Sequence, residues 1–168
     1  DVHSSDHPPR FRTKTYRDDI FRKLGDVHRI AEEHDVDFLL FTGDLFHFPQ
    51  ATKVSHGLVN KWLEWIDKAT CKIIIIPGNH DLAAGRLESI AKQPIGSLAT
   101  HPNVEILKQG EVITINGITI AGIEWNYSMD AAYIKSIMGN TNPDVLGIHA
   151  PITPKPNPFF DTIQREDI

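Results

Sequence analysis

An α/β fold is the structure that this sequence of 168 residues predicts. Amphipathic helical segments alternate with short apolar segments in the first half of the chain. The apolar segments lack polar alternation, which is typical of strands covered on both faces. The second half turns into short β-branched segments, two of which flank the hairpin signal Asn116-Gly117. We expect one domain over residues 1–168, because no internal repeat or low-complexity tract divides the chain.

Two helix–strand units account for the first half. A helix is predicted over residues 15–34, where apolar residues recur at helical spacing, and it leads into an apolar strand at 36–41. A second helix, over 52–68, leads into a strand at 71–76. These units predict a sheet with helices packed on it.

Shorter strands make up most of the second half. They are predicted at residues 104–107, 111–115, 118–123 and 144–149, with a short helix at 130–138. Four prolines between residues 151 and 158 predict an extended loop there.

Composition restricts the class of protein. The net charge of −5 argues against a protein that coats nucleic acid by charge alone, although it leaves room for an enzyme that acts on nucleic acid. No apolar run reaches the ~20 residues that a membrane-spanning helix needs, so no membrane partner is expected. The single cysteine, Cys71, predicts a protein without disulfides in a reducing compartment, which we take to be the cytoplasm.

Polar residues follow the predicted strands at the points where they end. In open α/β sheets, ligands bind at the carboxyl ends of the strands. The residues expected at that edge, including two at the start of the chain, are Asp1, His3, Asp44, Asn79, His80, Asp81 and His149. Carboxylate, amide and imidazole groups suit Mn, Fe, Zn or Mg rather than an ion that prefers thiolates. A carboxylate such as Asp44 can bridge two cations about 3.5–4 Å apart.

Each feature alone also has an ordinary explanation. Asp1 and His3 could belong to a disordered polar end, and Gly43-Asp44 could be a simple turn. His149 could be a core histidine. The tetrad Gly78-Asn79-His80-Asp81 after an apolar strand is the most specific of these signals.

In the order D-x-H, G-D, G-N-H-D and H, these motifs resemble those of the calcineurin-like metallophosphoesterases. The resemblance runs from Asp1 to the loop after His149. It implies a four-layer α/β/β/α sandwich, in which residues 104–123 form the turn into the second sheet.

The resemblance also implies a role for each residue. Asp1 and His3 would hold one divalent metal ion, and Asp44 would bridge two. Asn79 and His149 would hold the second ion, with Mn favoured and Fe, Zn or Mg acceptable. The catalytic residue would be His80, facing the scissile phosphate and oriented by Asp81.

One part of the family pattern is missing. The family motif Gly-His-x-His supplies a histidine to each metal, but no histidine follows His149 in this sequence. A buried strand would also precede Asp1. We therefore expect the chain to be trimmed at both ends relative to a working domain. Whether this trimmed chain is active stays open at this point.

Two features suggest DNA as the substrate. The stretch Gly43-Asp44-Leu45-Phe46-His47 resembles DNA double-strand-break-repair nucleases of the bacterial SbcD type, in which a histidine at the position of His47 acts at the phosphate. Those nucleases work with an ATPase partner. Arg10, Arg12 and Lys14, interleaved with aromatic residues, could follow a nucleic-acid backbone, or could lie in a solvated loop.

Three functions stay open on this evidence. The first is a metal-dependent nuclease acting on DNA, and the second is a phosphodiesterase or pyrophosphatase for a small molecule, since some lipid-precursor pyrophosphatases also carry G-D-L-F. The third is a non-catalytic scaffold of the same fold. A buried polar cluster at residues 79–81 argues against the scaffold, because burying polar groups without a purpose costs stability.

Overall fold

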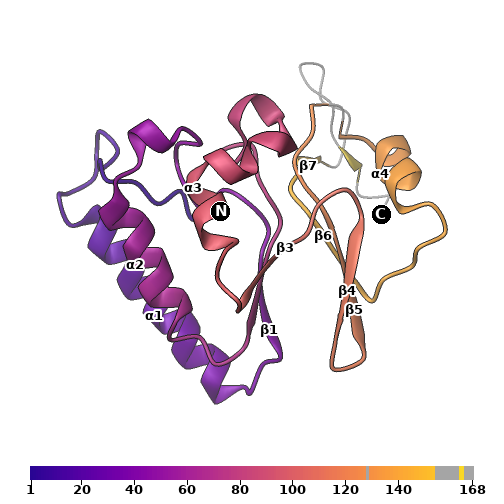
Figure 1. The fold of residues 1–168 in the computed structure, drawn as a ribbon, viewed down its shortest axis with the longest axis horizontal. Coiled ribbons are helices and arrows are strands. Elements are labelled where there is room, and N and C mark those ends of the chain that lie inside the picture. The colour runs from indigo at the N-terminus through magenta and orange to yellow at the C-terminus, as the bar shows by residue number, and fades with distance from the viewer. Residues whose placement is uncertain (128, 154–162, 165–168) are drawn as a thin grey trace.

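Four layers lie side by side in the computed structural model of the chain (Figure 1). The structure describes residues 1–127, 129–153 and 163–164. From left to right in the view, helices α1 and α2 cover one face of the first sheet, the second sheet lies against its other face, and α4 lies beyond the second sheet. This is the predicted α/β/β/α sandwich.

The first sheet is parallel, in the order β1-β2-β3. Its strands are Phe38–Phe41, Lys72–Ile75 and Val104–Ile106. The helices before β1 and β2 are α1, Tyr16–Glu33, and α2, His56–Ile66. The Ser55 side chain caps α2 by accepting a hydrogen bond from the Leu58 amide. Each predicted element of this half is present, although Ala51–Lys53 forms a separate 3₁₀ turn before α2.

The second sheet mixes the two strand directions. Strands β4 (Glu111–Ile115) and β5 (Ile118–Ile123) form an antiparallel hairpin, and β6 (Val145–Ile148) adds in parallel to β5. The hairpin turn has φ of 49° at Asn116 and 87° at Gly117, as a type I′ turn requires. Helix α4, Ala131–Met138, is capped by the Asp130 carboxylate, which accepts from the Tyr133 amide.

Shorter elements complete the described chain. They are the 3₁₀ turns η2 (Ala83–Gly85) and η3 (Leu87–Lys92), helix α3 (Pro94–Leu98), and the two-stranded pair of β7 (Ile152–Thr153) and β8 (Ile163–Gln164). The expected extended loop at 151–158 therefore begins with a short strand, and its residues 154–158 lie outside the described ranges.

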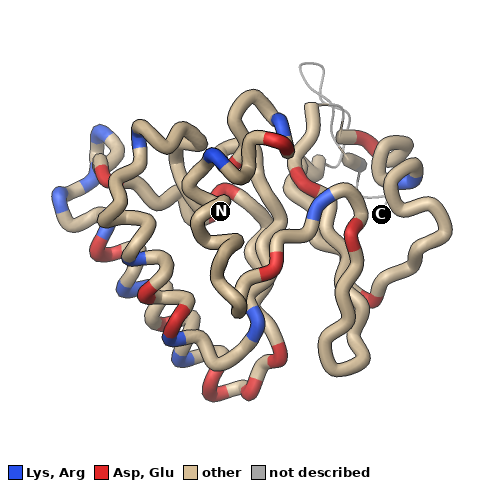
Figure 2. The backbone as a smooth tube through the Cα atoms, viewed as in Figure 1, with Lys and Arg blue, Asp and Glu red and all other residues tan. Residues whose placement is uncertain are grey.

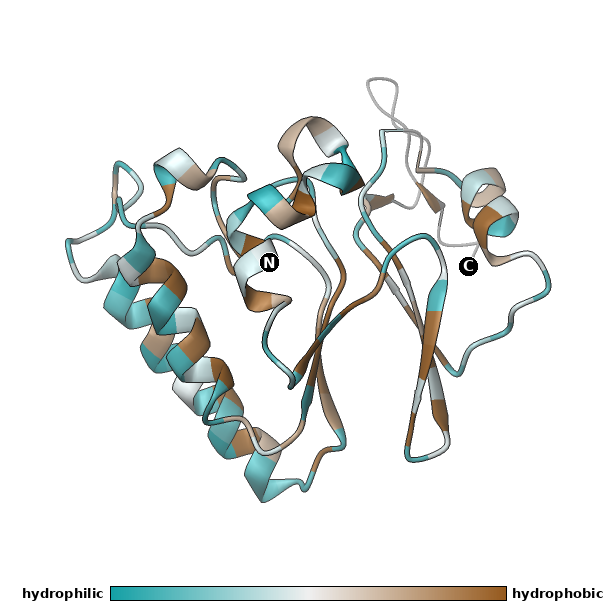
Figure 3. Cartoon of the chain, in the orientation of Figure 1, coloured by the Kyte–Doolittle hydropathy of each residue, from teal (hydrophilic) through white to brown (hydrophobic). Residues whose placement is uncertain are grey.

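Alternate side chains of the strands enter different apolar layers. In β2, Ile73 and Ile75 pack toward the helices, whereas Ile74 faces the second sheet. In β5, Ile120 packs between the sheets while Ala121 and Ile123 pack toward α4. Figure 3 shows hydrophobic residues along the strands of both sheets. Burial on both faces explains why these strands read as continuous apolar runs in the sequence.

One boundary differs from the expectation. Val104–Ile106 is the third strand of the first sheet and pairs with β2, so the crossing into the second sheet begins after it. Among the described helices, none has both the length and the apolar character needed to cross a membrane.

Candidate metal centre

One cavity gathers six of the predicted site residues, which come from four separate places along the chain. Its volume is about 520 Å³, and Asp1, His3, Asp44, Asn79, His80 and His149 all line it. Asp44 follows β1, Asn79 and His80 follow β2, and His149 directly follows β6. The strand ends therefore deliver these side chains to one place, as the alternation of helices and strands predicts.

The start of the chain is fixed to the loop after β1 by backbone hydrogen bonds. The amides of Val2 and His3 both donate to the Asp44 carbonyl, at 2.9 and 2.8 Å, and the Ser4 amide donates to Leu45. Ser4 is buried, and its hydroxyl accepts from the Trp62 indole at 2.9 Å. This anchoring places His3 against Asp44.

Two glycines let the loops approach each other closely. A Cβ atom on Gly78 would lie 2.2 Å from Asp44 Oδ1, and one on Gly43 would lie 2.2 Å from His149 Nδ1. Gly43 also has a φ of 96°, and Asp44 itself has a φ of 53°, a conformation that non-glycine residues seldom adopt. The backbone is thus shaped to bring the Asp44 carboxylate and the His149 ring together.

The Asp44 carboxylate lies between two groups of potential ligands. Its Oδ2 is 3.4 Å from His3 Nε2, and its Oδ1 is 3.7 Å from His149 Nε2. The Oδ1 atom also accepts the His80 backbone amide at 2.9 Å. Each oxygen therefore faces a different imidazole, which is the placement that a bridging carboxylate needs.

His149 presents one ring nitrogen, Nε2, to the side chains of Asn79 and Asp44. Its Nδ1 donates to the Thr42 carbonyl at 2.6 Å, so a neutral ring carries its lone pair on Nε2. That Nε2 is 3.1 Å from the Asn79 side-chain oxygen. A lone pair and two acceptor oxygens, from Asn79 and Asp44, converge there. Such a convergence of acceptors fits a cation, and the Thr42 contact fixes the ring as outer-shell partners of metal ligands do.

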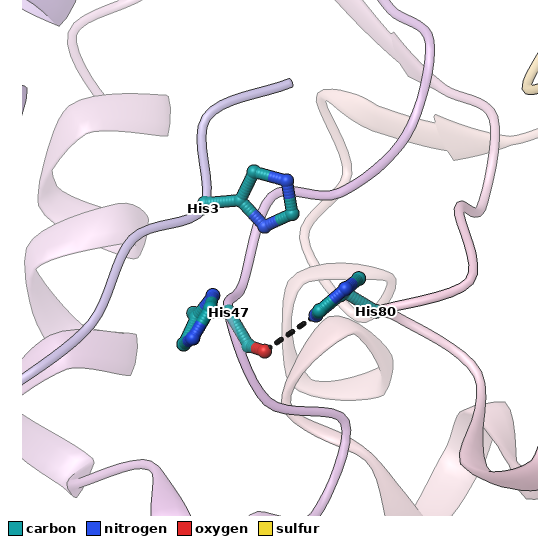
Figure 4. Close-up of side chains that lie close together, drawn as sticks. All are labelled: His3, His47 and His80. Carbon is teal, nitrogen blue, oxygen red and sulfur yellow. Dashed lines mark hydrogen bonds between the residues drawn. The ribbon is translucent and has the colours of Figure 1, made fainter. Parts of the chain in front are cut away.

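A second cluster consists of three imidazoles, His3, His47 and His80 (Figure 4). One nitrogen from each lies within 4.8 Å of the others. His80 Nδ1 donates to the His47 carbonyl at 2.6 Å, and the His47 and His80 rings stack at 5.4 Å between centroids. Burial lowers the pKa of His3; the Asp44 charge opposes this shift, and the neighbouring His80 and His47 add to it. His3 is therefore favoured in the neutral form that a metal ligand needs.

The model of the calcineurin-like phosphoesterase family matches residues 1–161. The chain belongs to the calcineurin-like phosphoesterase family. Membership implies metal-dependent hydrolysis of phosphoesters. No curated protein matches the chain.

The residues present fit the divalent metals that this family binds. Asp1, Asp44 and His149 offer one ligand atom each within 4.8 Å of one another. His3 Nδ1 is buried and has no hydrogen-bond partner among the described residues. Asp1 lies 3.8 Å from His149 and His3 lies among the histidines, with the Asp44 carboxylate between the two groups.

The expected role of Asp81 needs correction. The sequence placed it beside His80 as the residue that orients the imidazole, but the His47 carbonyl makes that contact. Asp81 is buried, and its carboxylate accepts from the backbone amides of Leu45, Phe46 and Gly78, at 3.0 to 3.4 Å. It thus ties the loop after β1 to the loop after β2. Burial is the main reason that its pKa rises to about 6.

The three cations predicted to bind substrate lie outside the cavity. Arg10, Arg12 and Lys14 are exposed, in the segment between His3 and α1 that loops out at the left of Figure 1. Figure 2 shows blue positions at this outer loop. Arg12 lines a neighbouring cavity with Asp1 and Tyr16. The Arg10 guanidinium lies 5.5 Å from the Phe11 ring centroid.

Further residues line the cavity that the sequence did not predict, and Trp125 and Thr42 are among them. Trp125 follows β5, and its backbone amide donates to the Pro77 carbonyl at 2.9 Å. The rule that strand ends meet at the site could have found Trp125, had it been applied to aromatic residues as well as to metal ligands.

Proposed function

We propose that this chain is a phosphodiesterase that hydrolyses DNA with two divalent metal ions. The observation that carries the proposal is the position of Asp44, with one carboxylate oxygen toward His3 and the other toward His149. Asp1, His3 and Asp44 would hold one ion, and Asp44, Asn79 and His149 the other. Manganese is our first candidate, since oxygen and imidazole ligands suit it.

When bound, the ions would supply Lewis-acid stabilisation of the phosphoryl oxygens and would activate water. The protein's own residues would position the substrate and move protons. The buried Asp44 keeps the two groups of ligands at a fixed separation, and Asp81 holds the loops that carry them.

His80 is the candidate proton donor. Because its Nδ1 donates to the His47 carbonyl, Nε2 is the ring nitrogen left to face a substrate. In the imidazolium form, Nε2 can give its proton to the leaving oxygen of the phosphodiester. His47 stacks on His80 and could stabilise the same phosphate.

DNA is the favoured substrate for two reasons. His47, which matches the histidine of the repair nucleases, lies in the same cluster as His80. The exposed Arg10, Arg12 and Lys14 offer cations outside the cavity, where a longer strand would run. An ATPase partner and a cytoplasmic location belong to the same proposal.

A small phosphodiester is the second candidate. The cavity of about 520 Å³ has the size of a site for a small molecule, and Trp125 and Pro151 form part of its wall. A substrate held entirely within it would not contact the outer cations.

The test is Mn²⁺-dependent hydrolysis of a labelled DNA oligonucleotide beside bis(4-nitrophenyl) phosphate, with Mn²⁺ binding measured by calorimetry on the same protein. We expect hydrolysis of both, with His80→Ala inactive and the exposed His34→Ala unchanged. Hydrolysis of the small diester alone would favour the second candidate. If Mn²⁺ binds and neither diester is cleaved, the chain is not a phosphodiesterase.

A further inference from the structure

Two aromatic side chains stand at the rim of the metal-centre cavity, and the proposed chemistry uses neither. Trp125 lines the cavity together with Asn79, His80 and His149. Tyr127, two residues later, is 71% exposed. The two rings contact each other edge to face, with centroids 4.3 Å apart and planes at 68°. They form a continuous aromatic surface from the cavity wall to the solvent.

The turn at Gly85, in the loop after β2, packs close to both rings. A Cβ atom on Gly85 would lie 3.0 Å from Cζ3 of Trp125 and 3.1 Å from Cε2 of Tyr127. Gly85 and the preceding Ala84 both have positive φ, 64° and 53°, so the backbone turns sharply to make this approach. A strained turn and the absence of a side chain thus bring the loop against both rings.

We propose that Trp125 and Tyr127 form a stacking site for the nucleobase next to the scissile phosphate. The inference rests on the proposed function, since it requires the phosphate to bind near His80. Planar bases stack on aromatic side chains with little dependence on sequence, and a partly exposed tyrosine beside the phosphate site is suited to that contact. An ester without a base would bind only through its phosphate.

The stacking site therefore predicts that the protein prefers nucleotides to simple phosphate esters, a preference that the metal ligands cannot produce. Ions and imidazoles recognise the phosphate alone, whereas Trp125 and Tyr127 distinguish a nucleotide from a simple phosphate ester. A single base stacked on an aromatic side chain raises affinity by about tenfold or more.

Binding gives a test that does not depend on catalysis. The affinities of thymidine 5′-monophosphate and 2-deoxyribose 5-phosphate are measured by calorimetry with Mn²⁺ present. We expect the nucleotide to bind about tenfold more tightly, the difference to disappear in Tyr127→Leu, and Tyr127→Phe to keep it. Equal affinity of the two compounds for the wild-type chain would overturn the proposal.

Hydrolysis tests the same contact with two esters that share a leaving group, thymidine 5′-(4-nitrophenyl phosphate) and methyl 4-nitrophenyl phosphate. Tyr127→Leu should lower the ratio of kcat/KM for the nucleoside ester over the methyl ester by about tenfold, through KM. An unchanged ratio would contradict the stacking site. If the wild-type chain cleaves neither ester, the proposed function fails, and the binding measurement still decides on Trp125 and Tyr127.

Discussion

The metal centre and the outer cationic loop (residues 9–14) differ in how far their polar residues are buried. Both were expected to act on substrate. At the centre, Asp44 is 4% exposed and accepts the His80 backbone amide, and Asp81 is 1% exposed and accepts three backbone amides. In the cationic loop all three cations are exposed, and the Phe11 side chain among them is 92% exposed.

This difference in burial determines how much each group of residues costs the stability of the fold. A buried carboxylate must be compensated by hydrogen bonds or by a cation, because its loss of hydration is costly. An exposed cation is screened by water and salt and costs the fold almost nothing. Substitutions at the centre should therefore have large and specific effects, and those in the cationic loop should have small effects that depend on salt.

The largest effect is expected from Asp44→Asn. A neutral amide at the bridging position would weaken both groups of ligands, so both ions should be lost together and hydrolysis should fall by about 10³-fold or more. The fold should survive, because the amide oxygen can still accept the His80 backbone amide. Metal content by calorimetric titration is the measurement, with the exposed Asp26→Asn as the matched control. Retention of one ion at full affinity would show that Asp44 does not bridge.

His80→Ala should come next, with hydrolysis lowered by about 10²–10⁴-fold because the proton donor is removed. Metal affinity should stay nearly intact, since His80 is outside both proposed ligand sets. Parallel measurements of kcat and Mn²⁺ affinity check this, with His34→Ala as control. A large loss of metal affinity would instead make His80 a ligand.

Asp81→Asn tests the internal support of the centre. An amide nitrogen cannot accept a hydrogen bond, so some of the amides of Leu45, Phe46 and Gly78 would lose their acceptor, at a cost of about 1–3 kcal/mol in the free energy of unfolding. Urea denaturation of the metal-free protein measures this cost, with Asp26→Asn as the surface control.

The cost of Asp81→Asn should also depend on pH. The pKa of Asp81 is raised from 3.8 to about 6, so the native state binds its proton more tightly than the unfolded state does. The wild-type protein therefore loses stability as pH rises from about 4 through about 6, by up to about 3 kcal/mol, and the variant lacks this loss. The difference between them should be largest near pH 4 and shrink toward pH 7. If the stability difference between wild type and variant grew with pH, hydrogen bonding rather than burial would determine the pKa of Asp81.

The same contrast explains what the sequence could predict. Apolar periodicity placed the predicted helices and strands to within a few residues, although it did not predict α3 or the short strands β7 and β8. The rule for strand ends brought Asp44, Asn79, His80 and His149 to one cavity. These predictions hold because burial on alternate faces determines where strands lie and end.

Contacts set by the path of the loops could not be predicted. Adjacency in sequence suggested that Asp81 orients His80, yet the turn at Gly78 sends its carboxylate to amides 35 and 36 residues away. Trp125 is a different case, because it follows β5 and was missed only since ligand chemistry does not mark an aromatic residue. The position of the cationic loop depends on how the segment after His3 packs, and this segment has no hydrophobic periodicity from which its packing could be predicted.

The smallest effect is expected from replacing Arg10, Arg12 and Lys14 together with serine. If DNA runs from the cavity along the cationic loop, its cleavage should fall several-fold at low salt, because a few phosphate contacts are lost, and the loss should shrink as salt rises. Cleavage of bis(4-nitrophenyl) phosphate should fall less, because a small diester in the cavity does not reach these side chains. The matched control replaces the exposed Arg22, Arg29 and Lys68 with serine, which removes the same charge elsewhere. Equal losses on both substrates, or an equal loss of DNA cleavage in the control, would show that residues 9–14 do not bind the DNA strand.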